Sequence, residues 1–99
     1  MASLPRVAQV EHLGDLRLGL TFTDGLVREL DFKNALSGSL FDQLRDPAYF
    51  SQVAIDSITG TVTWPNGIDF DPDVLHGDHP PATGEGPLLI SEHHLRATG

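Results

Sequence analysis

The chain has 99 residues, 39% of them hydrophobic, and this length and composition indicate one globular domain rather than a disordered segment. It contains no cysteine, which excludes disulfides, thiolate nucleophiles and cysteine-based zinc sites. A net charge of −8 argues against direct binding of DNA or RNA by this chain alone, because Lys and Arg contacts to phosphate supply most nucleic-acid affinity.

The charge is unevenly distributed along the chain. Residues 1–45 carry six acidic and five basic residues, whereas residues 46–99 carry eight acidic residues and one base, Arg96. A solvated acidic surface is one interpretation, and attraction to a basic protein partner is the other. The first residues, MASLPRV, contain no apolar signal core, and no long apolar run follows. We therefore expect a cytoplasmic protein that does not interact with membranes.

The first third of the chain predicts a β-hairpin preceded by a strand. We expect strands at 7–13 and at 16–22, where leucines alternate with polar residues, and a further strand in LVRELDF. A three-residue loop, 23–25, would pair Phe22 with Leu26 and Leu18 with Leu30, and would place Gly25 at a left-handed position. A two-residue loop would instead pair Leu20 with Glu29, so we favour the longer loop.

Short helical turns are expected in the middle of the chain. Residues 31–38 predict a helical turn or short loop, and Ser39 is a candidate cap for a helix running through Leu44, with Asp42 in its first turn. Asp46 followed by Pro47 predicts a second cap and a new short turn. The aromatic residues that follow are expected to anchor the core; they are Tyr49 and Phe50.

A second hairpin is predicted from VAID (53–56) and TVTW (61–64). Its four-residue loop puts the larger apolar residues on one face: Val53, Ile55, Val62 and Trp64. The other face carries Ala54, Asp56, Thr61 and Thr63. The predicted fold is therefore α+β, with a small antiparallel sheet of two hairpins and short helices packed on one face. Residues 1–77 are expected to form the domain, and 78–99 a Pro/Gly-rich linker and a C-terminal tail.

Three aspartates on alternate positions follow the turn predicted at Trp64–Pro65–Asn66–Gly67. Asp71 before Pro72 is typical of a helix N-cap, Asp73 falls in the positive first turn, and Gly77 ends the helix. An EF-hand loop is excluded, because its sixth position would be valine and its twelfth proline. Asp69 has no structural assignment and is a candidate partner-binding residue.

Three stretches resemble a known family: the Phe22-x-Asp24-Gly25 hairpin, LFDQLRDPAYFSQVAID, and TVTWPNGIDFDPDVLHG. They are similar to the bacterial family catalogued as domain of unknown function 2442, over about residues 7–77. The resemblance implies an α+β fold without known catalytic residues. Some members of that family are joined to a helix-turn-helix domain, and some are proposed antitoxin-like partners of small toxins. Residues 78–99 are too short for a DNA-reading domain.

No phosphate-binding loop, nucleophile elbow or HExxH motif occurs. Two groups of candidate metal ligands remain, His76-Gly-Asp78-His79 and Glu92-His93-His94, with exposed tail histidines as the competing interpretation. We expect no catalytic, cofactor or metal site, and hence a non-catalytic protein-binding module with an antitoxin-like or regulatory role. The alternative is a small metal-dependent enzyme that uses the Asp and His residues.

The tail contains a short apolar cluster, formed by Leu88, Leu89, Ile90 and Leu95. These residues are too few to form a core, so they must dock on the domain, bind another chain or remain exposed. We expect residues 87–91 to add a strand to a sheet edge, either in the same chain or in a second copy as a homodimer. Leu88, Leu89 and Ile90, with Asp69, are the candidate residues for binding a protein partner.

Overall fold

The computed structural model describes residues 5–36, 41–77 and 86–95. Its elements in chain order are β1 (Val7–Gly14), β2 (Arg17–Phe22), β3 (Leu26–Asp31), the 3-10 helix η2 (Gln43–Arg45), α1 (Pro47–Phe50), β4 (Ala54–Asp56), β5 (Thr61–Thr63), α2 (Pro72–His76) and β6 (Leu88–His94). Strands dominate, and the helices are short. In the described part of the chain, no helix has the length and apolar character needed to cross a membrane.

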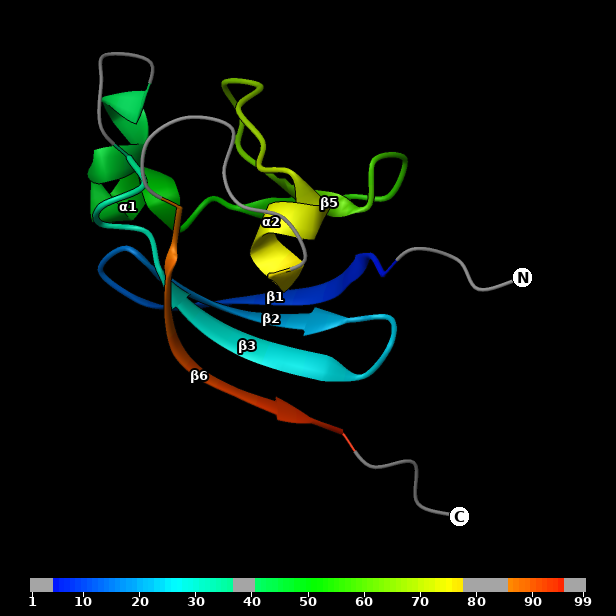
Figure 1. Ribbon diagram of the computed structural model, residues 1–99. Helices are drawn as coiled ribbons and strands as arrows, with labels where there is room; N and C mark the ends of the chain where they lie inside the picture. Colours follow the sequence, from blue (N-terminus) through cyan, green and yellow to red (C-terminus); the bar gives the residue numbers. More distant parts are fainter. Residues whose placement is uncertain (1–4, 37–40, 78–85, 96–99) are drawn as a thin grey trace.

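Four strands form an antiparallel sheet in the order β1-β2-β3-β6 (Figure 1). The register pairs Leu18 with Leu30 and Thr21 with Val27, as the three-residue loop predicts. Gly25 has a φ of +90°, and its N–H donates to the Phe22 carbonyl at 3.0 Å. The predicted turn is therefore confirmed, because only a left-handed residue closes it with apolar residues kept opposite one another.

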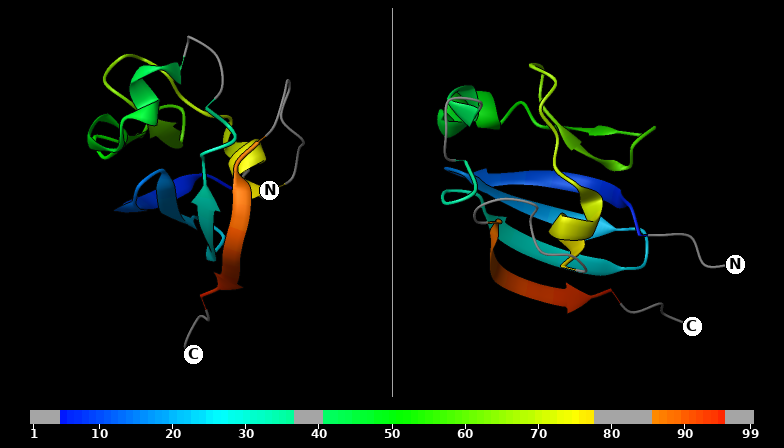
Figure 2. Two further views of the ribbon diagram at one scale, coloured as in Figure 1. Left: turned by 90° about the vertical axis from the view of Figure 1, so that its left-hand side faces the viewer. Right: turned by 45° about the horizontal axis from the view of Figure 1, so that its top comes forward.

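The α+β class is confirmed, but the expectation that both hairpins share one sheet is wrong. β4 and β5 form a separate two-stranded sheet that contacts β1 and lies in a second layer above the four-stranded sheet (Figures 1 and 2). The Val7 N–H donates to the Gly60 carbonyl at 2.9 Å and joins the layers at their edge. Stacking explains the difference, because it buries the apolar faces of both sheets against each other.

The second hairpin does not have the solvated polar face that its sequence predicts. Thr61 is only 2% exposed and donates its hydroxyl to the Phe70 carbonyl, while the Thr63 hydroxyl donates to the Ile68 carbonyl at 3.0 Å. Asp69 also forms a single backbone bridge with Thr63. The returning segment 68–70 therefore covers this face, and each threonine satisfies a carbonyl that would otherwise lose its contact with water.

The middle of the chain follows the prediction only in part. Ser39 lies outside the described residues, and Asp42 is not in the first turn of an α-helix; it stands at the N-cap of η2 and makes no side-chain capping bond. Asp46 does cap α1, because its Oδ1 accepts from the Ala48 N–H at 3.0 Å. Pro47 explains the break, since the residue before proline is driven from helical into extended conformation.

Aromatic side chains join the layers into one core. Phe50 on α1 has its ring centroid 5.6 Å from that of Phe32, which follows β3, and 5.3 Å from that of Trp64. Trp64 is 3% exposed, and its indole N–H donates to the Phe50 carbonyl at 2.9 Å. Phe50 is a buried core anchor as predicted, whereas Tyr49 is half-buried and packs against the core from outside.

The segment after β5 confirms the structural interpretation of two aspartates. The Gly67 N–H donates to the Trp64 carbonyl at 2.9 Å and closes the predicted turn. Asp71 Oδ1 accepts from the Asp73 N–H at 2.9 Å and caps α2, which ends at Gly77 with a φ of +96°. Helix α2 thereby directs Leu75, which is fully buried, onto the core.

The C-terminal apolar stretch does add a strand to a sheet edge, and it does so within the same chain. β6 pairs antiparallel with β3 from Leu88↔Asp31 to His94↔Leu26. Residues 88–94, which the sequence places in a tail, are thus part of the sheet. Of the predicted Pro/Gly-rich linker, residues 78–85 lie outside the described residues.

Replacing the buried tryptophan should destabilise the whole domain. Trp64→Ala is expected to cost about 3–5 kcal/mol in free energy of unfolding, because it removes a large core side chain and leaves a cavity. Trp64→Phe, which keeps an aromatic ring but loses the bond to Phe50, is the control and should cost less. Urea unfolding followed by circular dichroism measures both. Equal stability of the alanine variant and the parent would contradict the packing role.

Removing the α2 cap should have a smaller effect. Asp71→Ala is expected to lower the free energy of unfolding by about 0.5–2 kcal/mol, the usual loss for an N-cap. Asp71→Asn keeps the acceptor oxygen and should retain most of the stability. A large calcium- or zinc-dependent rise in Tm in the parent, abolished in the alanine variant, would instead assign Asp71 to a metal site.

Candidate functional site

β6 is an edge strand whose side chains are open to solvent on both faces of the sheet. All seven residues of the strand are exposed, and the strand lies at the end of the sheet beside β3 (Figures 1 and 2). Three consecutive apolar side chains occupy its first half: Leu88 is 51% exposed, Leu89 47% and Ile90 48%. An exposed apolar edge strand offers unpaired backbone groups and apolar surface in the same place.

A bulge interrupts the pairing of β6 in this apolar half. Glu29 pairs with Ser91 and Leu30 with Leu89, so Ile90 is the extra residue between two paired positions. A bulge bends a strand and strengthens its local twist. The apolar half of β6 therefore leaves the regular ladder at Ile90, and its side chains are displayed at the bend.

The second half of β6 is fastened to β3 by side chains. Glu92 Oε1 lies 3.1 Å from Nε of Arg28, and the Ser91 hydroxyl donates to Glu29 at 3.0 Å. Beyond the strand, the Leu95 N–H donates to the Gly25 carbonyl at 2.7 Å. β6 is thus held in place mainly through residues 91–95, whereas 88–90 contribute backbone pairing and exposed apolar surface.

Arg28 connects this edge to the upper layer. Besides its ion pair with Glu92, its guanidinium donates to the Leu75 carbonyl at 2.7 Å, in the last turn of α2. A cation at a helix C-terminus satisfies carbonyls that lack a partner within the helix. One largely buried side chain therefore links β3, α2 and β6.

The same end of α2 is also joined to the loop between β2 and β3. His76 Nε2 lies 2.7 Å from Asp24 Oδ2, and the His76 ring meets the Phe22 ring edge-on at 4.8 Å between centroids. Asp24 Oδ1 also accepts from the Leu26 N–H at 3.0 Å. Burial raises the pKa of Asp24, but the Leu26 bond and the contact with His76, with a smaller contribution from His94, together hold it below its usual value.

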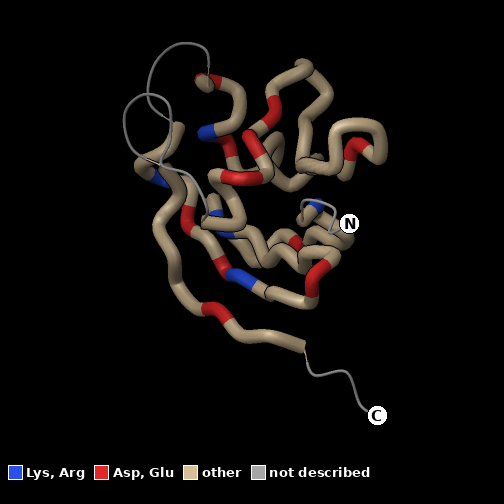
Figure 3. Tube along the Cα trace, turned by 45° about the vertical axis from the view of Figure 1, so that its right-hand side comes forward, with Lys and Arg blue, Asp and Glu red and all other residues tan. Residues whose placement is uncertain are grey.

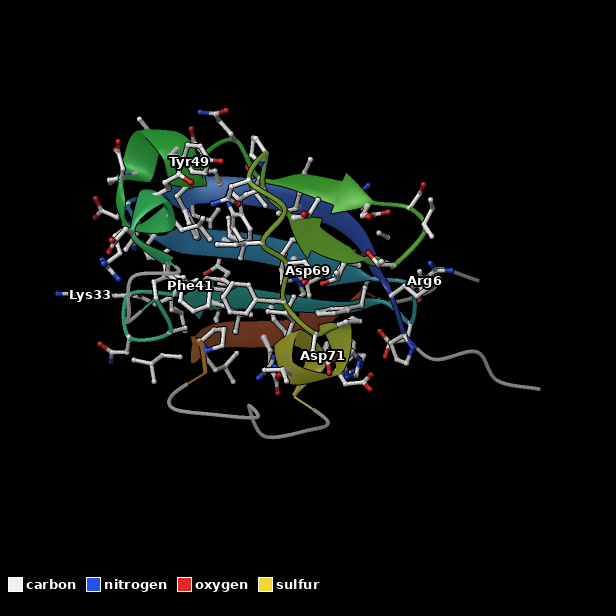
Figure 4. The ribbon with its side chains drawn as sticks, turned by 90° about the horizontal axis from the view of Figure 1, so that it is seen from above. Arg6, Lys33, Phe41, Tyr49, Asp69 and Asp71 are labelled. Atoms are coloured by element: carbon white, nitrogen blue, oxygen red, sulfur yellow. The ribbon has the colours of Figure 1, made fainter. Side chains whose placement is uncertain are left out.

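The candidate partner-binding residues do not form one site. Leu88, Leu89 and Ile90 lie together on β6, whereas Asp69 is exposed on the segment that crosses above the sheet between β5 and α2 (Figure 4). Figure 4 places Asp69 on that segment over the middle of the sheet, and Asp71 farther along it at the start of α2. The surface that the structure assembles is therefore the β6 edge, and Asp69 stays a separate prediction.

The candidate metal ligands are separated as well. His76 contacts Asp24, His93 and His94 are exposed on β6, and Asp78 and His79 lie outside the described residues. Within residues 5–36, 41–77 and 86–95, no group of three or more His, Asp or Glu side chains is arranged to hold a metal ion.

A hollow of about 490 Å³ lies at the opposite end of the sheet from Asp24. It is lined by Asp15, Leu16, Arg17, Asp31, Lys33, Arg45 and Pro47. Arg45 is already engaged with the Leu36 carbonyl and with Asp42, and the Lys33 side chain extends outward in Figure 4. Its charges are mixed, so the hollow has no clear preference for a ligand of either sign.

The sequence does not reveal the contacts that hold this edge together. Asp24 and His76 are 52 residues apart, and Glu29 and Ser91 are 62 apart. The one local signal was the apolar run in the tail, which correctly predicted a strand. The acidic and basic partners of that strand carry no spacing pattern by which they could be recognised.

The lowered pKa of Asp24 predicts an acid-sensitive contribution to stability. A carboxyl whose pKa is lower in the folded state stabilises the fold above its ordinary value near 3.8, and this contribution is lost as the pH falls through the folded-state pKa. Asp24→Asn should therefore be less stable than the parent near neutral pH, and the difference should shrink below about pH 4. Urea unfolding across this range measures the two curves, and a constant offset at all pH values would contradict the linkage.

Comparison with known proteins gives one match. A family profile described as protein of unknown function (DUF2442) matches residues 7–78, which leaves β6 outside the matched span. Searches of curated proteins and of solved structures found no match. Since the profile covers well over half of the chain and agrees with the resemblance in the hairpin, the DPAYF turn and the WPNG segment, this chain belongs to the DUF2442 family.

Proposed function

We propose that this chain is a non-catalytic protein-binding module that receives an extended segment of a partner protein along β6. The observation that carries the proposal is the exposure of every β6 residue at a sheet edge, with Leu88, Leu89 and Ile90 in succession. Extended segments add to such edges through backbone hydrogen bonds, while side-chain contacts on the two faces supply selectivity.

Burial of the apolar side chains of β6 would stabilise a complex at this edge. Each of the three apolar side chains keeps roughly half of its surface in water, so covering it would contribute on the order of 1 kcal/mol per residue, half the usual value for full burial. New backbone bonds along the free edge add to this contribution. A short segment of five or six residues would then bind with moderate affinity, which suits a regulated interaction.

The finer form of this proposal is an antitoxin-like or regulatory role in the cytoplasm, in which the chain binds and controls another protein. The competing function, a small metal-dependent enzyme using Asp and His residues, has no specific observation in its favour among the described side chains. We therefore base the proposal on the edge strand alone.

A charged substitution at the bulge tests the proposal. Ile90→Lys should weaken capture of a partner by about tenfold or more, because it places a charge where apolar burial and strand pairing are expected. Ile58→Lys is the matched control, since Ile58 is 87% exposed but lies in the turn between β4 and β5. The partner is captured from lysate of the source cell with the parent chain, identified, purified and titrated against all three proteins by calorimetry.

Amide exchange on the complex locates the contact. The proposal expects new protection in residues 88–94, and loss of that protection with Ile90→Lys but not with Ile58→Lys. Equal affinity of all three proteins, or protection confined to other elements, would show that the chain does not bind through β6.

A further inference from the structure

The surroundings of β6 are acidic although its apolar half is uncharged. Four carboxylates border the strand: Asp24, Glu29, Asp31 and Glu92. Among the described residues, two arginines lie beside them: Arg28 is engaged with Glu92 and with the Leu75 carbonyl, and Arg17 lies opposite Asp31 on β2. Figure 3 shows the acidic position on β6 and those on the neighbouring strand. A segment that binds here meets a negative field on a chain whose net charge is −8.

The carboxylates lie on both faces of the sheet. Arg28 points toward α2, so its partner Glu92 belongs to the face that the upper layer covers. Glu29 and Asp31 alternate with Arg28 along β3 and therefore belong to the opposite face. A strand added beside β6 would accordingly have acidic groups within reach of its side chains on either face.

This charge pattern distinguishes between two occupants of the edge. A second copy of the chain would bring another net charge of −8 to the same edge. Full antiparallel overlap of two β6 strands would also place Leu88–Ile90 opposite the polar half, Glu92–His94. Apolar residues would then face polar residues instead of other apolar ones, and like charges would approach one another. A basic segment meets neither difficulty.

We infer that the segment received by β6 is basic and amphipathic, with apolar residues opposite 88–90 and Lys or Arg opposite Ser91 and Glu92. This inference rests on the proposed function and adds the chemistry of the partner to it. Strands in a sheet lie about 4.8 Å apart, so a basic residue opposite Glu92 meets its carboxylate directly. A residue opposite Ser91 lies two strand spacings, about 10 Å, from Glu29, and a Lys or Arg side chain together with the glutamate side chain can span that gap.

Two synthetic peptides test the inference. The first has two basic residues followed by three β-branched apolar residues, the order that antiparallel pairing with β6 requires, and the second replaces both basic residues with glutamate. Fluorescence anisotropy with the full chain should show about tenfold or tighter binding of the basic peptide at about 50 mM salt. The preference should diminish at about 500 mM, because surface charges are then screened.

Charge-neutralising variants assign the contacts. Glu92→Gln and Glu29→Gln should each weaken the basic peptide by about threefold to tenfold, with little change for the acidic one. Glu11→Gln is the control, since Glu11 is exposed on β1, at the other edge of the sheet. Amide exchange on the free variants confirms that β6 stays paired with β3.

The outcomes separate this inference from the proposed function. If both peptides bind equally and lose affinity with Ile90→Lys, the edge is a binding site but the partner is not basic. The inference about the partner's charge is then wrong, while the proposed function stands. If the basic peptide binds equally to the parent and to Ile90→Lys, strand addition itself fails. A dimeric mass in light scattering, with β6 protected in the absence of peptide, would assign the edge to a second copy and overturn the inference.

Discussion

A largely buried arginine in the middle of β3 joins parts of this molecule that are far apart in the chain. Arg28 donates to the end of α2 through the Leu75 carbonyl and pairs with Glu92 on β6. A partly desolvated cation with two acceptors is worth more than an exposed ion pair, because losing one acceptor leaves charge that water reaches poorly. The position of α2 over the sheet and the position of β6 at its edge both depend on this side chain.

Much of the fold is local, and the sequence predicts those parts well. The alternating residues of β2, the left-handed Gly25, and the capped turns at Asp46 and Asp71 each depend on a few neighbouring residues. The physical causes, strand alternation and helix capping, act within a turn or two of chain. For these elements, local preference and final structure agree.

The sequence-based predictions are wrong where segments that are far apart in the chain pack against each other. The sequence predicts that Thr61 is a solvated strand residue, but it is buried because residues 68–70 return across it. The sequence predicts one sheet of two hairpins, whereas the structure has two sheets whose apolar faces are stacked on each other. The β6 edge contains one feature that the sequence predicts and one that it does not. Its apolar run is visible in the sequence, but Glu29, Arg28 and Glu92 come together only through the register of β3 with β6.

β6 combines features that protect an edge strand with a first half that exposes apolar side chains. Natural proteins protect edges with charge, bulges or covering segments, and β6 has a bulge at Ile90 and a polar second half. Its first half nevertheless exposes three apolar residues. In the interaction that we propose, apolar burial would supply affinity, while the surrounding carboxylates would govern which segment approaches and how fast. A net charge of −8 also repels other copies of the chain, so the charge that we propose for attracting a basic partner would protect the exposed edge from self-association as well.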